Sequence, residues 1–204
     1  SFVVMSNDGT ASQTVTITIA GSNDTPVVTA GVVTGSFDEP DNVTGASAPT
    51  PTLSGSFTIA DADISGTTTL TPAFGTFSTN YGARTTLTTD QQTALLAGLM
   101  LTPTPALGND ASVAWTYSVP NSEVDFLRQG EVLSFTLNVT VNDGAGGVVI
   151  QPITITMTGD NDAVQLGVVD NSGAVSEPAT GTISDSGTIT FTDADFENHL
   201  VLTN

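Results

Sequence analysis

The feature that most constrains this 204-residue sequence is that it repeats itself. Several blocks recur in one order, and each block is a strand-like stretch next to turn residues. The matched pairs are 1–24 with 134–162, FDEP at 37–40 with VSEP at 175–178, and SFTIADAD at 56–63 with TITFTDAD at 188–195. The period is 138 residues at two positions (162 − 24 and 177 − 39) and 132 at a third (193 − 61). Self-similarity of this length predicts a tandem array.

The period divides the chain into three parts. Residues 1–24 supply the C-terminal strands of one repeat, residues 25–162 form a complete repeat, and residues 163–204 supply the N-terminal strands of a following repeat. We expect open strand edges in the two incomplete parts, because their remaining strands are not in the sequence. The chain is therefore expected to be a window on a longer polymer, or to pair its ends with a neighbour by strand exchange.

Hydrophobic periodicity predicts β-strands throughout. Val15, Ile17 and Ile19 alternate with threonines, and the apolar residues of 133–141 alternate with polar ones in the same way. Strict alternation is typical of strands with one buried face, and threonine suits the wet face. The Asn-Asp-Gly triplet at 142–144 is typical of a hairpin turn. The prediction is an all-β fold of tandem antiparallel β-sandwiches.

Two short segments are predicted to be helical. Residues 90–98 begin with a capping aspartate and end on glycine, which indicates a helix of about two turns. A second helical turn is expected at 122–129, before Gly130. The leucines of the first segment and the residues just after it are expected to pack in the core: Leu95, Leu96, Leu99, Met100 and Leu101.

Composition excludes several function classes. The chain carries 21 acidic residues against two arginines and no lysine, for a net charge of −19. Nucleic acids and anionic membranes attract clustered basic residues, so neither is an expected partner, and no apolar run is long enough for membrane insertion. Cysteine is absent and His199 is the single histidine, so disulfides, thiolate sites and two-histidine metal sites are excluded. An enzyme is not expected.

The acidic residues gather at the ends of predicted strands, beside glycine and proline, and recur from repeat to repeat. Carboxylates together with asparagine and backbone oxygens are the ligands that Ca²⁺ prefers. Without a cation, carboxylates that converge on one point repel each other, and there is no lysine to neutralise them. The predicted Ca²⁺ ligands are Asn23, Asp24, Glu39, Asp61, Asp63, Asp143, Asp160, Asn161, Asp162, Glu177, Asp193 and Asp195.

Strand order predicts which of these residues meet. Asp61 and Asp63 follow a strand that ends at Ala60, and Asp143 lies in the hairpin between the last two strands, so both are expected to face the entry linker. Glu39 lies 15 residues after Asp24 (39 − 24), a separation that extended chain spans over about 45–50 Å. Glu39 is therefore expected at the far end, near residues 160–162 and the next repeat.

The second half of the repeat resembles a known family. Its order is Trp115-x-Tyr117, Leu127-x-x-Gly130-Glu131, Val139-x-Val141-x-Asp143-Gly144-x-Gly146, and Ile153-x-Ile155-x-Met157-x-Gly159-x-Asn161-Asp162. This order is similar to the VCBS repeat of large bacterial surface adhesins. More remotely, Asp-Ala-Asp after a strand, an Asp-Gly hairpin and an Asn-Asp linker resemble cadherin-type, Ig-like repeats.

The resemblance implies an extracellular protein, exported by type I secretion from Gram-negative bacteria, whose repeats are joined by Ca²⁺ in the linkers. One departure concerns the junctions: the first linker has Ser22 where the second has Asp160, so the two need not bind Ca²⁺ equally. The resemblance is weak over 64–112, where residues 81–105 look like an insertion.

Two functional hypotheses follow. In the first, the chain is a Ca²⁺-stiffened spacer or fibre segment of a bacterial adhesin or surface filament. In the second, segment 64–112 binds a glycan or protein ligand, with Phe74, Phe77 and Tyr81 in a loop as its contact residues. Trp115 and Tyr117 are expected to be core residues or a surface pair rather than a sugar-binding platform, and Arg84 is expected to pair with Asp90.

Overall fold

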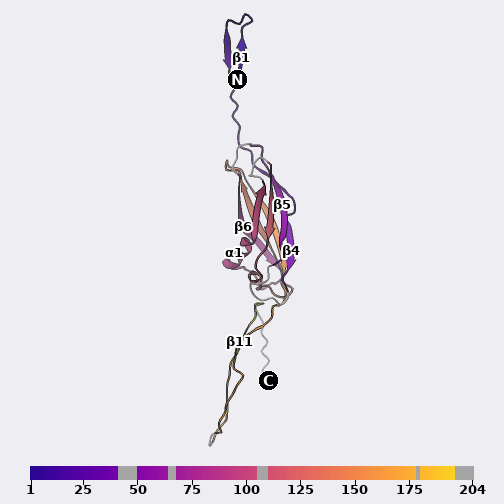
Figure 1. The fold of residues 1–204 in the computed structure, drawn as a ribbon, viewed down its shortest axis with the longest axis vertical. Helices are drawn as coiled ribbons and strands as arrows, with labels where there is room; N and C mark the ends of the chain where they lie inside the picture. Colours follow the sequence, from indigo (N-terminus) through magenta and orange to yellow (C-terminus); the bar gives the residue numbers. More distant parts are fainter. Residues whose placement is uncertain (41–49, 64–67, 105–109, 178–179, 196–204) are drawn as a thin grey trace.

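The computed structural model describes residues 1–40, 50–63, 68–104, 110–177 and 180–195. His199 and parts of the predicted binding segment 64–112 lie outside these ranges. The described chain is elongated (Figure 1): an N-terminal hairpin stands at one end, a sandwich forms the middle, and a second hairpin extends from the other end.

The complete repeat folds into two four-stranded sheets, ordered β3-β5-β8-β7 and β4-β10-β9-β6. Their strands are β3 (Val27–Ala30), β4 (Thr34–Asp38), β5 (Leu53–Ala60), β6 (Thr69–Thr79), β7 (Leu99–Thr104), β8 (Asp110–Tyr117), β9 (Val132–Asn142) and β10 (Val148–Thr158). Neighbours pair antiparallel, with one exception: β4 runs parallel to β10. The predicted all-β sandwich is confirmed.

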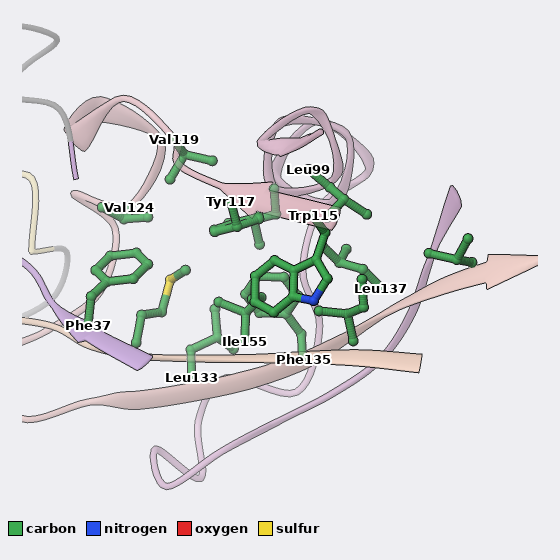
Figure 2. Close-up of a cluster of buried hydrophobic side chains, with 14 of the residues drawn as sticks. Phe37, Leu99, Trp115, Tyr117, Val119, Val124, Leu133, Phe135, Leu137 and Ile155 are labelled. Atoms are coloured by element: carbon green, nitrogen blue, oxygen red, sulfur yellow. The ribbon is translucent and has the colours of Figure 1, made fainter. Parts of the chain in front are cut away.

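The core lies between the two sheets (Figure 2). Along β9 the buried positions alternate with half-buried ones, as the sequence pattern predicts, and the buried residues are at most 1 % exposed. Trp115 and Tyr117 of β8 face them from the other sheet, and the Tyr117 ring meets the Phe135 ring edge-on at 6.0 Å. The indole N–H of Trp115 donates to the carbonyl of Val32 at 2.8 Å. Trp115 and Tyr117 are therefore core residues, which decides between the two alternatives that the sequence left open.

The hydroxyl of Tyr117 is buried and has no hydrogen-bond partner among the described residues. Burying a hydroxyl without a partner costs free energy, whereas a phenylalanine ring would fill the same space without that cost. We expect Tyr117→Phe to raise the free energy of unfolding by about 1 kcal/mol. Chemical denaturation of the two chains measures the difference, and a loss of stability would show that the hydroxyl has a stabilising partner.

The predicted first helix is present as α1 (Thr89–Ala97). Thr88 caps it, because its side chain accepts from the N–H of Gln91 while the Gln91 side chain accepts from the N–H of Thr88. The second predicted helical turn begins one residue earlier, as the short 3₁₀ helix η1 (Asn121–Glu123). Each element therefore begins within a residue of its sequence prediction.

Residues 81–105, which look like an insertion relative to the known repeat, are an integral part of the sandwich. α1 connects β6 to β7, and these two strands are the outer strands of the two sheets. Leu87, Leu95 and Leu99 from this segment are buried core residues. Deletion of the segment would remove a strand and part of the core, so it would unfold the sandwich rather than test a binding surface.

The aromatic residues of that segment are also placed differently from the prediction. Phe74 and Phe77 lie on β6 rather than in a loop, and the Phe74 ring stacks on Phe135 at 5.5 Å. The Tyr81 ring is covered by the guanidinium of Arg128 at 4.6 Å. Packing within the sandwich therefore accounts for all three residues of the proposed ligand surface.

Two further side-chain predictions are wrong. Met100 is 67 % exposed, because it points outward from β7 between residues that point inward. Arg84 pairs with Glu131 at 2.5 Å rather than with Asp90, and it also donates to the carbonyl of Phe126. Burial by itself would raise the pKa of Glu131, but the Arg84 and Thr79 hydrogen bonds hold it below its usual value.

The two terminal segments form separate two-stranded sheets. β1 (Phe2–Met5) pairs with β2 (Ser12–Val15), and β11 (Gln165–Val169) pairs with β12 (Ile189–Thr192). The repeat period makes the first hairpin the counterpart of β9–β10 and the second pair the counterpart of β3 and β5.

Candidate metal site at the repeat junction

Strand direction gathers acidic residues at the two ends of the sandwich. We call the end near the N-terminal hairpin the entry pole and the end near β11 the exit pole (Figure 1). β4 and β10 run parallel, so both end at the exit pole. Glu39 directly follows β4 and Asp160 lies just after β10, and this pairing therefore brings them side by side.

Backbone hydrogen bonds hold Glu39 at the exit pole. Its N–H donates to the carbonyl of Thr158 at 2.8 Å, which extends the parallel pairing by one residue. Its carboxylate accepts from the N–H of Asp160 at 3.1 Å. The Glu39 side chain is thus fixed against the linker that leaves the repeat.

Glu39, Asp125 and Asp162 form a buried acidic cluster. One carboxylate oxygen from each lies within 4.8 Å of the others, and the three residues are 3 %, 9 % and 2 % exposed. Asn121, which is fully buried, donates to the Asp125 carboxylate at 2.6 Å and so orients it. The three residues come from the end of β4, the turn after η1 and the linker, which are far apart in the sequence.

The cluster also receives residues of the following repeat. The Asp195 carboxylate accepts from the N–H of Asp162 at 2.7 Å, and the Asp193 carboxylate accepts from the N–H of Asp195 at 3.1 Å. Linker residue Asn161 donates from its side chain to the carbonyl of Asp162 at 2.8 Å. The exit pole therefore combines a complete repeat, its linker and the repeat that follows.

The electrostatics of the cluster disfavour its ionised state when no cation is present. Burial raises the pKa of Glu39 to about 8, and the negative charges of Asp162 and Asp125 act in the same direction. Burial also raises the pKa of Asp195, with Asp193 adding to the effect. At neutral pH the Glu39 carboxyl is therefore mostly protonated, and a cation bound beside it would favour its ionised form.

The entry pole repeats part of this arrangement. Asp63 accepts from the N–H of Asp24 at 2.6 Å, and Asp61 accepts from the N–H of Asp63 at 3.0 Å. At the exit pole, Asp162, Asp195 and Asp193 make the equivalent bonds at 2.7 and 3.1 Å. The residues that match in sequence thus make matching contacts at both junctions.

Asp143 has a different environment from the other entry-pole acids. One carboxylate oxygen accepts from the N–H groups of Ala145, Gly146 and Gly147, and the other accepts from the side chain of Asn23 at 2.9 Å. The Asn23 bond, followed by the loop N–H groups, lowers the pKa of Asp143. Asp143 therefore organises its hairpin and fastens the entry linker to it.

The predicted ligands thus fall into three groups. The exit pole brings together Glu39, Asp160, Asn161, Asp162, Asp193 and Asp195; the entry pole brings together Asn23, Asp24, Asp61, Asp63 and Asp143. Glu177 lies with neither group and is exposed.

Sequence reasoning missed Asn121 and Asp125. They lie in a segment that occurs once in this chain, since the two incomplete repeats contain no counterpart of 121–125. Comparison between repeats could therefore not single them out. The available indication was the run Asn-Ser-Glu-Val-Asp directly after a predicted strand, which also fits an ordinary helical turn.

The exit-pole donors fit a hard divalent cation. All of them are oxygens, and Ca²⁺ binds six to eight oxygens at about 2.3–2.6 Å, so ligand oxygens on opposite sides of one ion lie about 5 Å apart. The three cluster oxygens all lie within 4.8 Å of one another, which is close enough for them to contact a single ion. One oxygen of Glu39 and one of Asp195 are buried without a hydrogen-bond partner in the described chain, which leaves them available to an ion. Glu39, Asp125, Asp162 and Asp195 would hold it, and its charge would offset theirs.

Comparisons of the chain with models of known protein families and with characterised protein sequences find no match. Among the described residues, no helix has the length and hydrophobicity needed to cross a membrane. The functional argument therefore depends on the geometry of the junctions.

Proposed function

We propose that this chain is a Ca²⁺-stiffened spacer segment of a long extracellular bacterial surface protein. The observation that carries the proposal is the exit-pole cluster, whose carboxylates come from one repeat, from the linker and from the next repeat. A cation bound there would be shared by both repeats. Its binding free energy would then oppose any bend that separates them.

The distribution of charge supports a structural role. The strands of both sheets have outward faces rich in threonine, serine and alanine, and the acids are concentrated at the poles. In the described part of segment 64–112, Phe74 and Phe77 are partly buried against the core. The groups of the sandwich that could bind a cation therefore lie at the junctions between repeats.

Distances between spin labels test the stiffening directly. The chain has no cysteine, so Ser78→Cys on β6 and Thr188→Cys beyond the exit pole can be labelled specifically. We expect Ca²⁺ to narrow the distance distribution between these labels relative to chelator, because it fixes the angle at the junction. Mixing the labelled chain with an excess of unlabelled chain ensures that the measured distances lie between two labels of the same molecule.

A label pair within the complete repeat, Ser78→Cys with Thr116→Cys, serves as the control. Its distribution should be equally narrow with and without Ca²⁺, because both sites lie on paired strands of one sandwich. If the distribution of distances between the Ser78→Cys and Thr188→Cys labels is as broad in Ca²⁺ as in chelator, the proposal is contradicted, even if the cation binds.

A further inference from the structure

The ion pair between Arg84 and Glu131 joins two loops of the complete repeat. Arg84 is one of the two arginines in a chain without lysine, and it lies between β6 and α1. Its Nε donates to one carboxylate oxygen of Glu131 at 2.5 Å, and a terminal nitrogen donates to the other at 3.0 Å. The two side chains are only 15 % and 1 % exposed. A two-pronged, largely buried pair of this kind fixes the relative position of the loops that carry it.

Arg84 also holds the residue next to a member of the exit-pole cluster. Its terminal nitrogen donates to the carbonyl of Phe126 at 2.7 Å, and its guanidinium lies over the Phe126 ring, 4.8 Å from the ring centre. Phe126 directly follows Asp125, one of the three buried carboxylates of the cluster. Arg84 therefore restrains both the main chain and the side chain of the residue beside a candidate ligand.

The loop that contains Glu131 holds the start of the exit linker as well. The N–H of Gly159 donates to the carbonyl of Glu131 at 2.8 Å, and the N–H of Gly130 donates to the carbonyl of Gly159 at 2.9 Å. A Cβ at Gly159 would lie 2.5 Å from the carbonyl oxygen of Arg128, so only glycine lets the linker pass this close to the loop. Asp162, a second carboxylate of the cluster, follows three residues later. The loop thus fixes the cluster from two sides.

The ion pair acts on the cluster by position rather than by net charge. Burial by itself would raise the pKa of Glu131, but the hydrogen bonds from Arg84 and Thr79 lower it, so the pair is ionised and its two charges cancel. The hydrogen bonds of Arg84 go to Glu131 and Phe126, and neither residue is among the candidate cation ligands.

We propose that Arg84 is a positioning residue for the exit-pole cation site. It holds loop 125–131, which places Asp125 directly and Asp162 through the bonds to Gly159. The inference rests on the proposed function, since it names a residue on which Ca²⁺ binding at that site depends. Partners that orient metal ligands without touching the metal typically change its affinity by about 10–100-fold.

Calorimetric titration of Ca²⁺ into folded chains tests the inference. We expect Arg84→Gln to weaken binding about tenfold, because the loop loses its brace. The double variant Arg84→Gln/Glu131→Gln removes the pair without changing its net charge, and it should weaken binding to the same extent. Arg84→Lys keeps the charge but not the planar fork, so it should restore only part of the affinity. A double variant that binds as tightly as the unchanged chain would attribute the effect to charge and overturn the inference.

Val139→Ala is the control for a general loss of stability. Val139 is fully buried in the middle of β9, so the variant should unfold at a lower temperature and still bind Ca²⁺ with unchanged affinity. The inference is wrong if Arg84→Gln is folded and binds Ca²⁺ as tightly as the unchanged chain. It is equally wrong if Val139→Ala loses as much affinity as Arg84→Gln does.

Amide hydrogen exchange in excess chelator tests the brace without Ca²⁺. We expect Arg84→Gln to speed exchange at Gly159, whose N–H donates to the loop, much more than at Ile153 in the middle of β10. Unchanged exchange at Gly159 would overturn the inference even if Ca²⁺ binds. An unchanged chain that binds no Ca²⁺ would instead refute the proposed spacer, whereas the exchange rates would still show whether Arg84 holds the linker.

Discussion

In the presence of Ca²⁺ the chain should unfold at a temperature about 5–10 °C higher than in excess chelator. A ligand present at about 100 times its dissociation constant adds roughly 2.7 kcal/mol per site to the free energy of unfolding. For a domain of this size, each kcal/mol corresponds to several degrees. Mg²⁺ should give a much smaller shift, because it requires near-octahedral geometry and gives up its waters reluctantly. Calorimetry of the 204-residue chain measures the shift.

The internal repeat supplies a matched pair of variants for this experiment. Glu39→Gln removes one carboxylate from the exit-pole cluster while keeping its size, and it should reduce the Ca²⁺-dependent shift by more than half. Glu177→Gln makes the same change at the equivalent position 138 residues later, where the side chain is exposed. The second variant should keep the full shift. Equal shifts in both variants would show that Ca²⁺ does not bind at the cluster.

Without Ca²⁺, stability should fall as the pH rises from about 5 to 8. The pKa of Glu39 is about 8 in the folded chain, against 4.5 for an ordinary glutamate, so the folded state holds this proton more tightly than the unfolded state does. The stabilisation is complete below pH 4.5 and is lost as the pH approaches 8. Each unit of pKa difference is worth about 1.4 kcal/mol, so the loss should be on the order of 3 kcal/mol.

Ca²⁺ should reverse this trend, because the cation binds ionised carboxylates and binding releases their protons. The stabilisation by Ca²⁺ should therefore increase from pH 5 to 8. Denaturant unfolding at several pH values, with Ca²⁺ and with chelator, measures both slopes. Glu39→Gln should flatten the slope in chelator, which would assign the pH dependence to Glu39. An unchanged slope in this variant would assign the pH dependence to another group.

Local sequence patterns predicted the elements that depend on near neighbours. The alternation of residues 133–141 identified β9 and its buried face, because a strand with one face in the core needs an apolar residue at every second position. α1 was predicted from Asp90 as its capping residue and from its terminal glycine. The cap is instead Thr88, and Asp90 lies in the first turn of the helix. Its first and last residues, Thr89 and Ala97, each lie one position before those of the predicted segment.

Predictions that required a long-range partner were less successful. Arg84 was assigned to Asp90, six positions away, but it pairs with Glu131 across the fold. Residues 81–105 were taken as an insertion because the resemblance to the known repeat is weak there, yet they supply α1 and β7. The sequence around a charged residue or an apolar stretch does not show which distant residues it contacts, because those contacts depend on how the two sheets are assembled.

The sequence by itself determined the repeat, the strands and the concentration of acids at strand ends, since each is visible in the order of the residues. Strand order also predicted that Glu39 lies near residues 160–162, and the two are in contact in the structure. Only the tertiary structure showed how the rest of the cluster is assembled. The parallel pairing of β4 with β10 carries Glu39 to the exit pole, and the turn after η1 adds Asp125, which the repeat could not reveal. The physical reason is that periodicity records which face of a strand is buried, whereas the neighbour of each strand depends on how the whole chain closes into two sheets.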